Sequence, residues 1–267
     1  MCKLPHEFYQ TYFDQDIYEA FKYDVGAHCT RSAILNKITT QAGTILEIGV
    51  GISSLLEYVQ NFECYGVDIA EKTVLTTENL FKAKGLQASF FQANATMLPF
   101  KDNFFDVIVT SHVFEHIEQD ELAIAEVART LKPHGKFIIF VPGSMDGKSS
   151  AIEWETCGHY RNYNLKEVQR LEASTHGLLK LTSVSYPHKV HNLVWNRLKH
   201  VFRWANYPIR KWIMQDTKGF EARATYRRFL LPVLAASLDY IDGATHKHES
   251  YLLGAKFNVL AVFEKMR

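Results

Sequence analysis

Two glycines and two acids in the first third of the chain have the types and spacing of a ligand site. Glu47, Gly49 and Gly51 follow a short apolar run, and a helical pattern begins soon after them. Glycine suits such a bend because it accepts positive φ and lets a ligand approach the backbone. A second apolar run ends in Asp68, whose carboxylate can accept hydrogen bonds from both hydroxyls of a ribose. These residues predict a nucleotide-like ligand at a strand-to-helix turn.

The loop also distinguishes between kinds of nucleotide ligand. A dinucleotide site has the pattern G-x-G-x-x-G, but Ser54 stands where the third glycine is expected. The sequence therefore favours a cofactor other than NAD. An NAD-binding oxidoreductase remains as an alternative, because the acid at position 68 suits either ligand.

The elements that must position these residues alternate between strand and helix from residue 44 onward. Alternation of this kind predicts a parallel sheet with helices on both faces, and ligands bind at the carboxyl ends of its strands. The strand candidates are 44–48, 63–68, 87–92, 105–110, 136–141, 178–186 and 257–264. The helix candidates are 53–61, 71–84, 120–132 and 164–176, the last with Asn164 and Glu167 spaced as a capping box.

Composition sets the broad class of protein. The 267 residues are 47% hydrophobic and 22% charged, with a formal net charge of +1. Four scattered cysteines form no C-x-x-C pair, which fits a reducing compartment, and no apolar run reaches the length that spans a bilayer. We expect a cytoplasmic protein with no nucleic-acid partner.

One stretch departs from this average. Residues 188–250 are helical in pattern, and the stretch from His188 to Arg228 contains ten Lys or Arg residues but only two acidic residues. The stretch also contains Trp195, Trp204 and Trp212. We interpret it as a basic cap that contacts an anionic membrane peripherally or grips a phosphate-bearing acceptor; a solvated helix face with inward tryptophans is the plainer alternative.

Several further motifs occur in order between residues 44 and 142. They are Asn94-Ala95 with Leu98-Pro99-Phe100, Phe105-Asp106-Val107-Ile108, Ser111 to Glu115-His116, and Leu131-Lys132-Pro133-His134-Gly135. Together with the Glu47 loop they resemble the type 11 family of class I S-adenosylmethionine-dependent methyltransferases. Asn94 stands where the family usually has Asp, and His134 replaces the first glycine of a Gly-Gly turn.

The resemblance implies a fold and a cofactor, S-adenosylmethionine. The fold is α/β, a Rossmann-like doubly wound seven-stranded sheet with the last strand antiparallel. Its parts would be an N-terminal helical segment (1–40), the cofactor-binding core (41–187), the cap inserted at 188–250, and a final strand region (251–267). The implied cofactor residues are Glu47, Gly49 and Gly51 for the methionine part, Asp68 for the ribose, Asn94 for the adenine, Ser111 and His112 for the cleft floor, and in addition Ile69 and Ala95.

The acceptor side is carried by a second resemblance. Gly158-His159-Tyr160-Arg161-Asn162-Tyr163 is similar to the G-H-x-R-x-Y segment that covers the active site in many such enzymes. His159 and His116 are therefore our candidate catalytic groups, since a neutral imidazole can take a proton near pH 7. The alternative is that His159 and Arg161 only fix the loop.

His112, Glu115 and His116 also match the metallopeptidase pattern H-x-x-E-H. That mechanism needs both histidines on one helix face, but here the pattern follows a strand in a methyltransferase-like framework. Some methyltransferases bind a divalent cation through E-x-x-E-H at this loop; His112 replaces the first Glu, and we expect no metal.

We expect transfer of a methyl group to a small-molecule, sugar or lipid-linked acceptor, on oxygen rather than nitrogen. A non-catalytic binding or scaffold protein remains the alternative from a different class.

Overall fold

The computed structural model describes residues 25–51, 53–187 and 257–267. The predictions for the first 24 residues, for the basic cap at 188–250 and for residues 251–256 lie outside the described residues.

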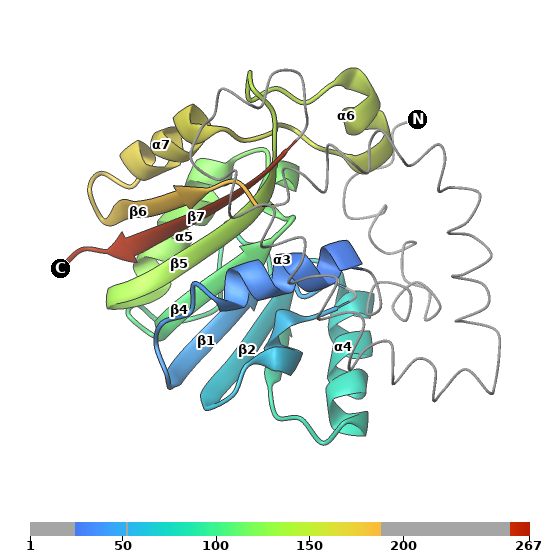
Figure 1. The fold of residues 1–267 in the computed structure, drawn as a ribbon. Helices are drawn as coiled ribbons and strands as arrows, with labels where there is room; N and C mark the ends of the chain where they lie inside the picture. Colours follow the sequence, from blue (N-terminus) through green and yellow to red (C-terminus); the bar gives the residue numbers. More distant parts are fainter. Residues whose placement is uncertain (1–24, 52, 188–256) are drawn as a thin grey trace.

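The fold is built on a single seven-stranded sheet with the order β3-β2-β1-β4-β5-β7-β6 (Figure 1). Its strands are β1 (Gly43–Ile48), β2 (Phe62–Asp68), β3 (Ser89–Gln92), β4 (Phe105–Ser111), β5 (Leu131–Gly143), β6 (Leu179–Ser185) and β7 (Phe257–Lys265). The pairs among β1 to β5 are parallel, whereas β7 runs antiparallel to both β5 and β6. The predicted sheet, with its antiparallel last strand, is confirmed.

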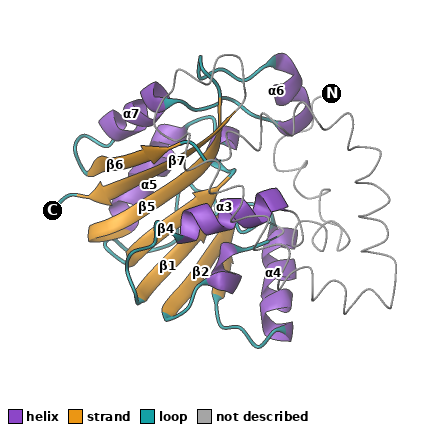
Figure 2. Ribbon diagram, viewed as in Figure 1, coloured by secondary structure: helices purple, strands orange, loops and turns teal. Residues whose placement is uncertain are grey.

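Helices cover both faces of the sheet (Figure 2). On one face lie α3 (Val25–Leu35), the 3-10 helix η1 (Leu55–Tyr58) and α4 (Glu71–Ala83), which contribute Ile34, Leu55 and Phe81 to one apolar cluster. On the other lie α5 (Asp120–Thr130) and α7 (Leu165–Ser174), with Ile124 and Leu171 in the second cluster. The 3-10 helix η2 (Phe114–His116) follows β4, and α6 (Ala151–Cys157) follows β5.

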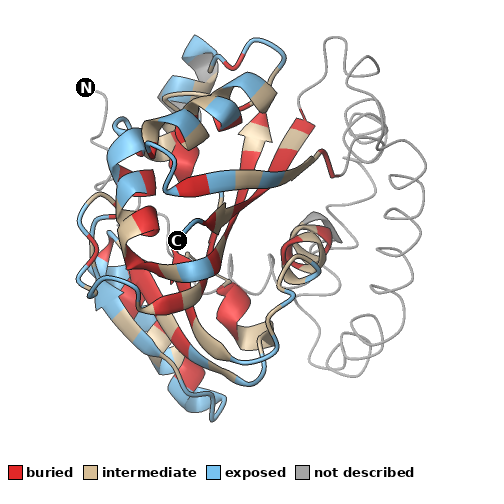
Figure 3. Cartoon of the chain, turned by 90° about the vertical axis from the view of Figure 1, so that its left-hand side faces the viewer, coloured by how far each residue is buried: buried red, intermediate tan, exposed pale blue. Residues whose placement is uncertain are grey.

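Alternation along the central strands explains why both faces need a cover. In β5, Phe137, Ile139 and Val141 belong to the cluster under α5, while Ile138 and Phe140 belong to the opposite one. All five side chains are fully buried, and buried residues continue along the neighbouring strands (Figure 3). Near-continuous apolar strands of this kind are typical of a sheet with helices on both faces.

The predicted helix over 53–61 is wrong. The structure has only the 3-10 turn Leu55–Tyr58 there, followed by extended backbone at Val59. The Glu47 carboxylate accepts hydrogen bonds from the Ser54 hydroxyl and the Leu55 N–H, which fixes this turn against β1. A tertiary contact therefore decides the local conformation.

Two helix ends also differ from expectation. The α5 helix ends at Thr130 rather than 132, because Pro133 disfavours helical backbone at the residue before it. Asn164 caps α7 through the Glu167 N–H, but the complete capping box belongs to α6, where Ser150 and Glu153 satisfy each other's backbone N–H groups. The sequence analysis did not predict α6.

Within the described ranges, no helix combines the length and apolarity that a bilayer crossing requires.

Candidate cofactor and acceptor site

The loop after β1 has the backbone that its glycines predicted. Gly49 and Gly51 have φ of 78° and 51°, a region that side chains disfavour. A Cβ atom at Gly49 would lie 2.2 Å from Val113 Cγ2, so this residue must be small. At Gly51 the nearest atom to such a Cβ would be the Gly49 carbonyl oxygen, 3.9 Å away in the same loop. Among the described residues, no atom outside this loop lies within 4 Å of that position, which leaves room for a ligand.

Asp68 lies beside this loop, at the carboxyl end of β2. Its Oδ2 accepts from the Gly51 N–H at 3.2 Å and its Oδ1 from the Ala70 N–H at 3.0 Å. Burial raises the pKa of this carboxyl, although the backbone donors oppose that effect. The Ile69 N–H also donates to this carboxylate, and the acceptor capacity that remains can serve a ribose hydroxyl. This geometry fits a ribose.

Glu47 lies under the loop rather than on its surface. Its side chain is 4% exposed, and its carboxylate accepts from the Ser54 hydroxyl at 2.5 Å and the Leu55 N–H at 3.0 Å. Burial raises its pKa to about 7, against the lowering effect of these donors. The direct contact predicted between Glu47 and the cofactor stays a prediction; the structure shows that Glu47 shapes the loop.

The predicted adenine residue follows β3, one strand further along. Asn94 is exposed, and its Oδ1 accepts from the Thr96 N–H at 3.0 Å. That oxygen keeps one lone pair for a second donor. Ala95 is buried beneath, and Ile69 is 45% exposed at the end of the neighbouring strand. All three lie at the carboxyl edge of the sheet, and their contact with a cofactor stays a prediction.

Ser111 ends β4, and His112 turns the chain away from it. His112 has a φ of 55°, which is uncommon for a residue other than glycine. Its N–H donates to the Phe140 carbonyl at 2.8 Å and its ring lies edge-on to Phe140, 5.2 Å between centroids. Strained backbone of this kind concentrates at functional sites.

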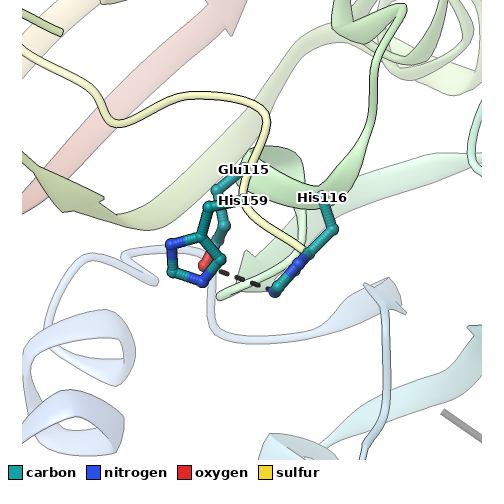
Figure 4. A group of neighbouring side chains, drawn as sticks. All are labelled: Glu115, His116 and His159. Atoms are coloured by element: carbon teal, nitrogen blue, oxygen red, sulfur yellow. Dashed lines mark ion pairs between the residues drawn. The ribbon is translucent and has the colours of Figure 1, made fainter. Parts of the chain in front are cut away.

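Three side chains meet just beyond this turn: Glu115, His116 and His159, called here the Glu–His cluster (Figure 4). One ligand atom from each lies within 4.8 Å of the others. Glu115 is fully buried, with His112 Nδ1 at 3.3 Å and His116 Nε2 at 3.9 Å from its Oε1. The rings of His116 and His159 are 4.7 Å apart. The structure thus brings together both predicted catalytic histidines.

The electrostatics of the Glu–His cluster follow from burial and proximity. Burial alone would raise the pKa of the Glu115 carboxyl, but His112 and His116 hold it below its ordinary value. Burial lowers the pKa of His116, and the attraction of Glu115 only partly offsets that effect. At neutral pH the arrangement is an ionised carboxylate beside an uncharged His116 imidazole.

A network around Asp120 positions the segment that carries His159. Arg161 donates to the carbonyls of Ile117 and Glu118 at 2.7 and 2.6 Å and pairs with Asp120 at 2.9 Å. The Tyr163 hydroxyl donates to the same Asp120 oxygen at 2.8 Å. These contacts agree with the loop-fixing interpretation of Arg161. Sequence reasoning missed Asp120, whose only signal was an acid in the first turn of a helix.

The loop and the sheet together define the class of protein. The loop that contains Gly49 and Gly51 lies where the segments after β1 and β4 run to opposite faces of the sheet, the switch point at which open α/β sheets bind ligands. The room beside Gly51 and the remaining acceptor capacity of Asp68 fit an adenosine ligand with a ribose. With its antiparallel β7, this is the fold of the class I S-adenosylmethionine-dependent methyltransferases, and S-adenosylmethionine is the cofactor of that class.

Residues 46–139 match the family model described as a methyltransferase domain, so the chain carries such a domain. Among curated proteins, an uncharacterised methyltransferase YcgJ of Bacillus subtilis is 35% identical over 100 residues, 36% of this chain and 39% of the relative. Phosphoethanolamine N-methyltransferase 2 of Caenorhabditis elegans is 27% identical over 132 residues, 48% of this chain and 30% of the relative. The sequence match thus spans less than half of either protein.

Solved structures agree on the fold. Haemonchus contortus phosphoethanolamine N-methyltransferase 2, in complex with S-adenosyl-L-methionine, superposes with a TM-score of 0.66 at 16% identity, covering 98% of this chain and 60% of that one. The Bacillus subtilis YcgJ structure gives a TM-score of 0.55 at 17% identity, covering 90% of this chain and 98% of that one.

Proposed function

We propose that this protein transfers a methyl group from S-adenosylmethionine to a small-molecule acceptor, and that the acceptor binds beside the Glu–His cluster. The observation that carries the proposal is the convergence of Glu115, His116 and His159 just beyond Val113, whose side chain packs against Gly49. A group that accepts a proton and a loop that fits a nucleoside are the two halves that methyl transfer needs.

The chemistry asks little of the protein beyond placement and proton removal. The sulfonium is an activated donor, so in-line attack by a positioned nucleophile accounts for much of the rate. An acceptor hydroxyl must lose its proton, and an uncharged imidazole takes a proton readily near pH 7. His116 has the lowered pKa of such a group, and His159 lies against it.

We assign the acceptor atom to oxygen in preference to nitrogen. A hydroxyl acceptor needs help with proton removal more than an amine acceptor does. The Glu–His cluster supplies a buried carboxylate beside imidazole for that purpose. Similar proteins that carry an N-methyltransferase name include those of Caenorhabditis elegans and of Rauvolfia serpentina. Incubation of a set of hydroxyl and amine acceptors with methyl-labelled S-adenosylmethionine decides between the two, and label confined to the amines would refute oxygen.

The cofactor half is tested by titration with S-adenosylhomocysteine in a calorimeter. Asp68→Ala removes the ribose acceptor and the partner of the Gly51 N–H, so we expect at least a ~10-fold loss of affinity, on the scale of one or two lost hydrogen bonds to a charged group. Asp102→Ala is the matched control, because Asp102 is exposed at the opposite edge of the sheet. No binding by the unaltered protein, or equal affinity in Asp68→Ala, would refute the site.

The titration, taken together with the methyl-transfer assay, also distinguishes an enzyme from a non-catalytic binding protein. S-adenosylhomocysteine binding without methyl transfer to any acceptor pool would favour the non-catalytic role.

We propose in addition a cytoplasmic location with peripheral membrane contact through residues 188–228, supported by their excess of Lys and Arg. Co-sedimentation with anionic liposomes, weakened by salt, is the expected result. Its absence would favour an acceptor in solution, rather than one linked to a lipid.

A further inference from the structure

Glu115 is a buried carboxylate whose ion-pair partners among the described residues are the imidazoles of His112 and His116, not a Lys or Arg side chain. The side chain is fully buried, and neither carboxylate oxygen has a hydrogen bond to any described residue. A buried carboxylate in this state is costly unless a cation or a set of donors compensates it. Arg161 and Arg170 pair with Asp120 and not with Glu115.

The groups that face Glu115 are imidazoles. Its Oε1 lies 3.3 Å from His112 Nδ1 and 3.9 Å from His116 Nε2, and His159 completes the Glu–His cluster within 4.8 Å. In the close-up the three side chains of the cluster converge from two segments of chain (Figure 4). Two imidazoles and one carboxylate are a donor set for a divalent transition-metal ion.

Hydrogen bonding around the cluster has the form that metal ligation requires. His116 Nδ1 lies 3.4 Å from the Gly158 carbonyl, which turns Nε2 toward Glu115. A histidine that binds a metal commonly donates its other N–H to a backbone carbonyl in this way. The Tyr160 N–H donates to the Glu115 carbonyl at 2.8 Å and holds the two segments together. The frame is thus fixed by the backbone.

We propose that Glu115, His116 and His159 bind one divalent first-row transition-metal ion, such as Zn²⁺ or Mn²⁺. This goes against the expectation from the sequence, which assigned no metal. The ion would place a coordinated positive charge beside the buried Glu115 carboxylate, and mixed nitrogen and oxygen ligands select these ions over Ca²⁺ and Mg²⁺.

The role of the ion rests on the proposed function. Three protein ligands leave a coordination position for the acceptor oxygen, and a bound cation lowers the pKa of that hydroxyl. With the ion bound, His116 and His159 are ligands, so water rather than an imidazole takes the proton of the hydroxyl. The oxygen forms a bond to the methyl carbon, and the carbon–sulfur bond breaks with its electron pair going to sulfur. The products are the methyl ether, S-adenosylhomocysteine and one proton.

Metal binding is testable without activity. The full chain, with any affinity tag removed, is stripped with a chelator, dialysed, and titrated with Zn²⁺ or Mn²⁺ alone in a calorimeter. We expect one ion per chain in the unaltered protein, and at least a ~10-fold loss of affinity in Glu115→Gln and in His159→Ala. Visible absorption of added Co²⁺ reports nitrogen ligation in the same samples. His134→Ala is the control, because His134 is exposed and pairs with Glu264.

Circular dichroism shows whether each variant is folded. If Glu115→Gln does not fold, because Glu115 is buried, His159→Ala alone tests the metal site. Binding of less than one ion by the unaltered protein, or equal affinity in His159→Ala and His134→Ala, would overturn the metal site. S-adenosylhomocysteine binding is measured on the same preparations, so loss of the metal site and failure of the proposed function are told apart.

Discussion

The sharpest quantitative prediction concerns Glu47 and the pH dependence of stability. Burial raises its pKa from 4.5 to about 7 in the folded protein. Between these two pH values the folded chain binds one more proton than the unfolded chain, so the free energy of unfolding falls as pH rises. The contribution is present in full below pH 4.5 and is lost by the time pH exceeds about 7.

The size of the effect follows from the same two values. Each tenfold change in proton affinity is worth about 1.4 kcal/mol, so the loss across this window is about 3 kcal/mol. Glu47→Gln keeps the shape of the protonated side chain and removes the titration. Relative to the unaltered protein, the variant should therefore gain about 3 kcal/mol between pH 4.5 and pH 7.5.

Urea unfolding followed by circular dichroism at several pH values measures this difference. Other carboxyls, among them Asp106 and Glu126, have lowered pKa values, so their contributions to the free energy of unfolding are lost in acid. This loss is the same in both proteins and cancels in the comparison. Glu78→Gln is the control, since Glu78 is an exposed partner of Lys82 on α4. Parallel stability curves for Glu47→Gln and the unaltered protein would show that Glu47 is not buried as described.

Three further changes probe the loop and the acceptor side. Gly49→Ala places a Cβ against Val113 at a positive φ, and should cost about 1–3 kcal/mol in urea unfolding and weaken S-adenosylhomocysteine binding; unaltered binding would contradict the loop geometry. Asp120→Asn leaves Arg161 and its neighbours without their shared buried anion, which should cost about 3–5 kcal/mol of unfolding free energy. His159→Ala should reduce the methyl-transfer rate about 10²–10⁴-fold with cofactor affinity kept, and an equal loss of both would assign His159 to folding.

The sheet could be predicted from the sequence because its signal is local. Each strand is an apolar run of strand length, and turn residues separate it from the next element; Gly85 closes α4 with a φ of 67°. His134 stands where the family has glycine and adopts a φ of 64°, so even that departure keeps the expected backbone.

The failures share a physical cause, which is a contact between residues far apart in sequence. The predicted helix over 53–61 does not form, because the Glu47 carboxylate on the preceding strand accepts hydrogen bonds from Ser54 and Leu55 and fixes a short turn there. Asp120 could not be recognised as a buried anchor, since its partners Arg161 and Tyr163 follow about 40 residues later. Local patterns carry no information on such pairs.

The difference between local spacing and contact between distant segments also decides which histidine completes the Glu–His cluster. The H-x-x-E-H spacing selects His112 and His116, which would share one face of an α-helix. The chain instead has a positive φ at His112 and a 3-10 turn at Phe114–His116, and the group within ligand distance contains His159. His112 is half-exposed and contacts Glu115 from outside this group. In the Zn²⁺ titration, His112→Ala should therefore keep a bound ion while His159→Ala loses it. The reverse result would mean that spacing along the chain, rather than the meeting of two distant segments, defines the site.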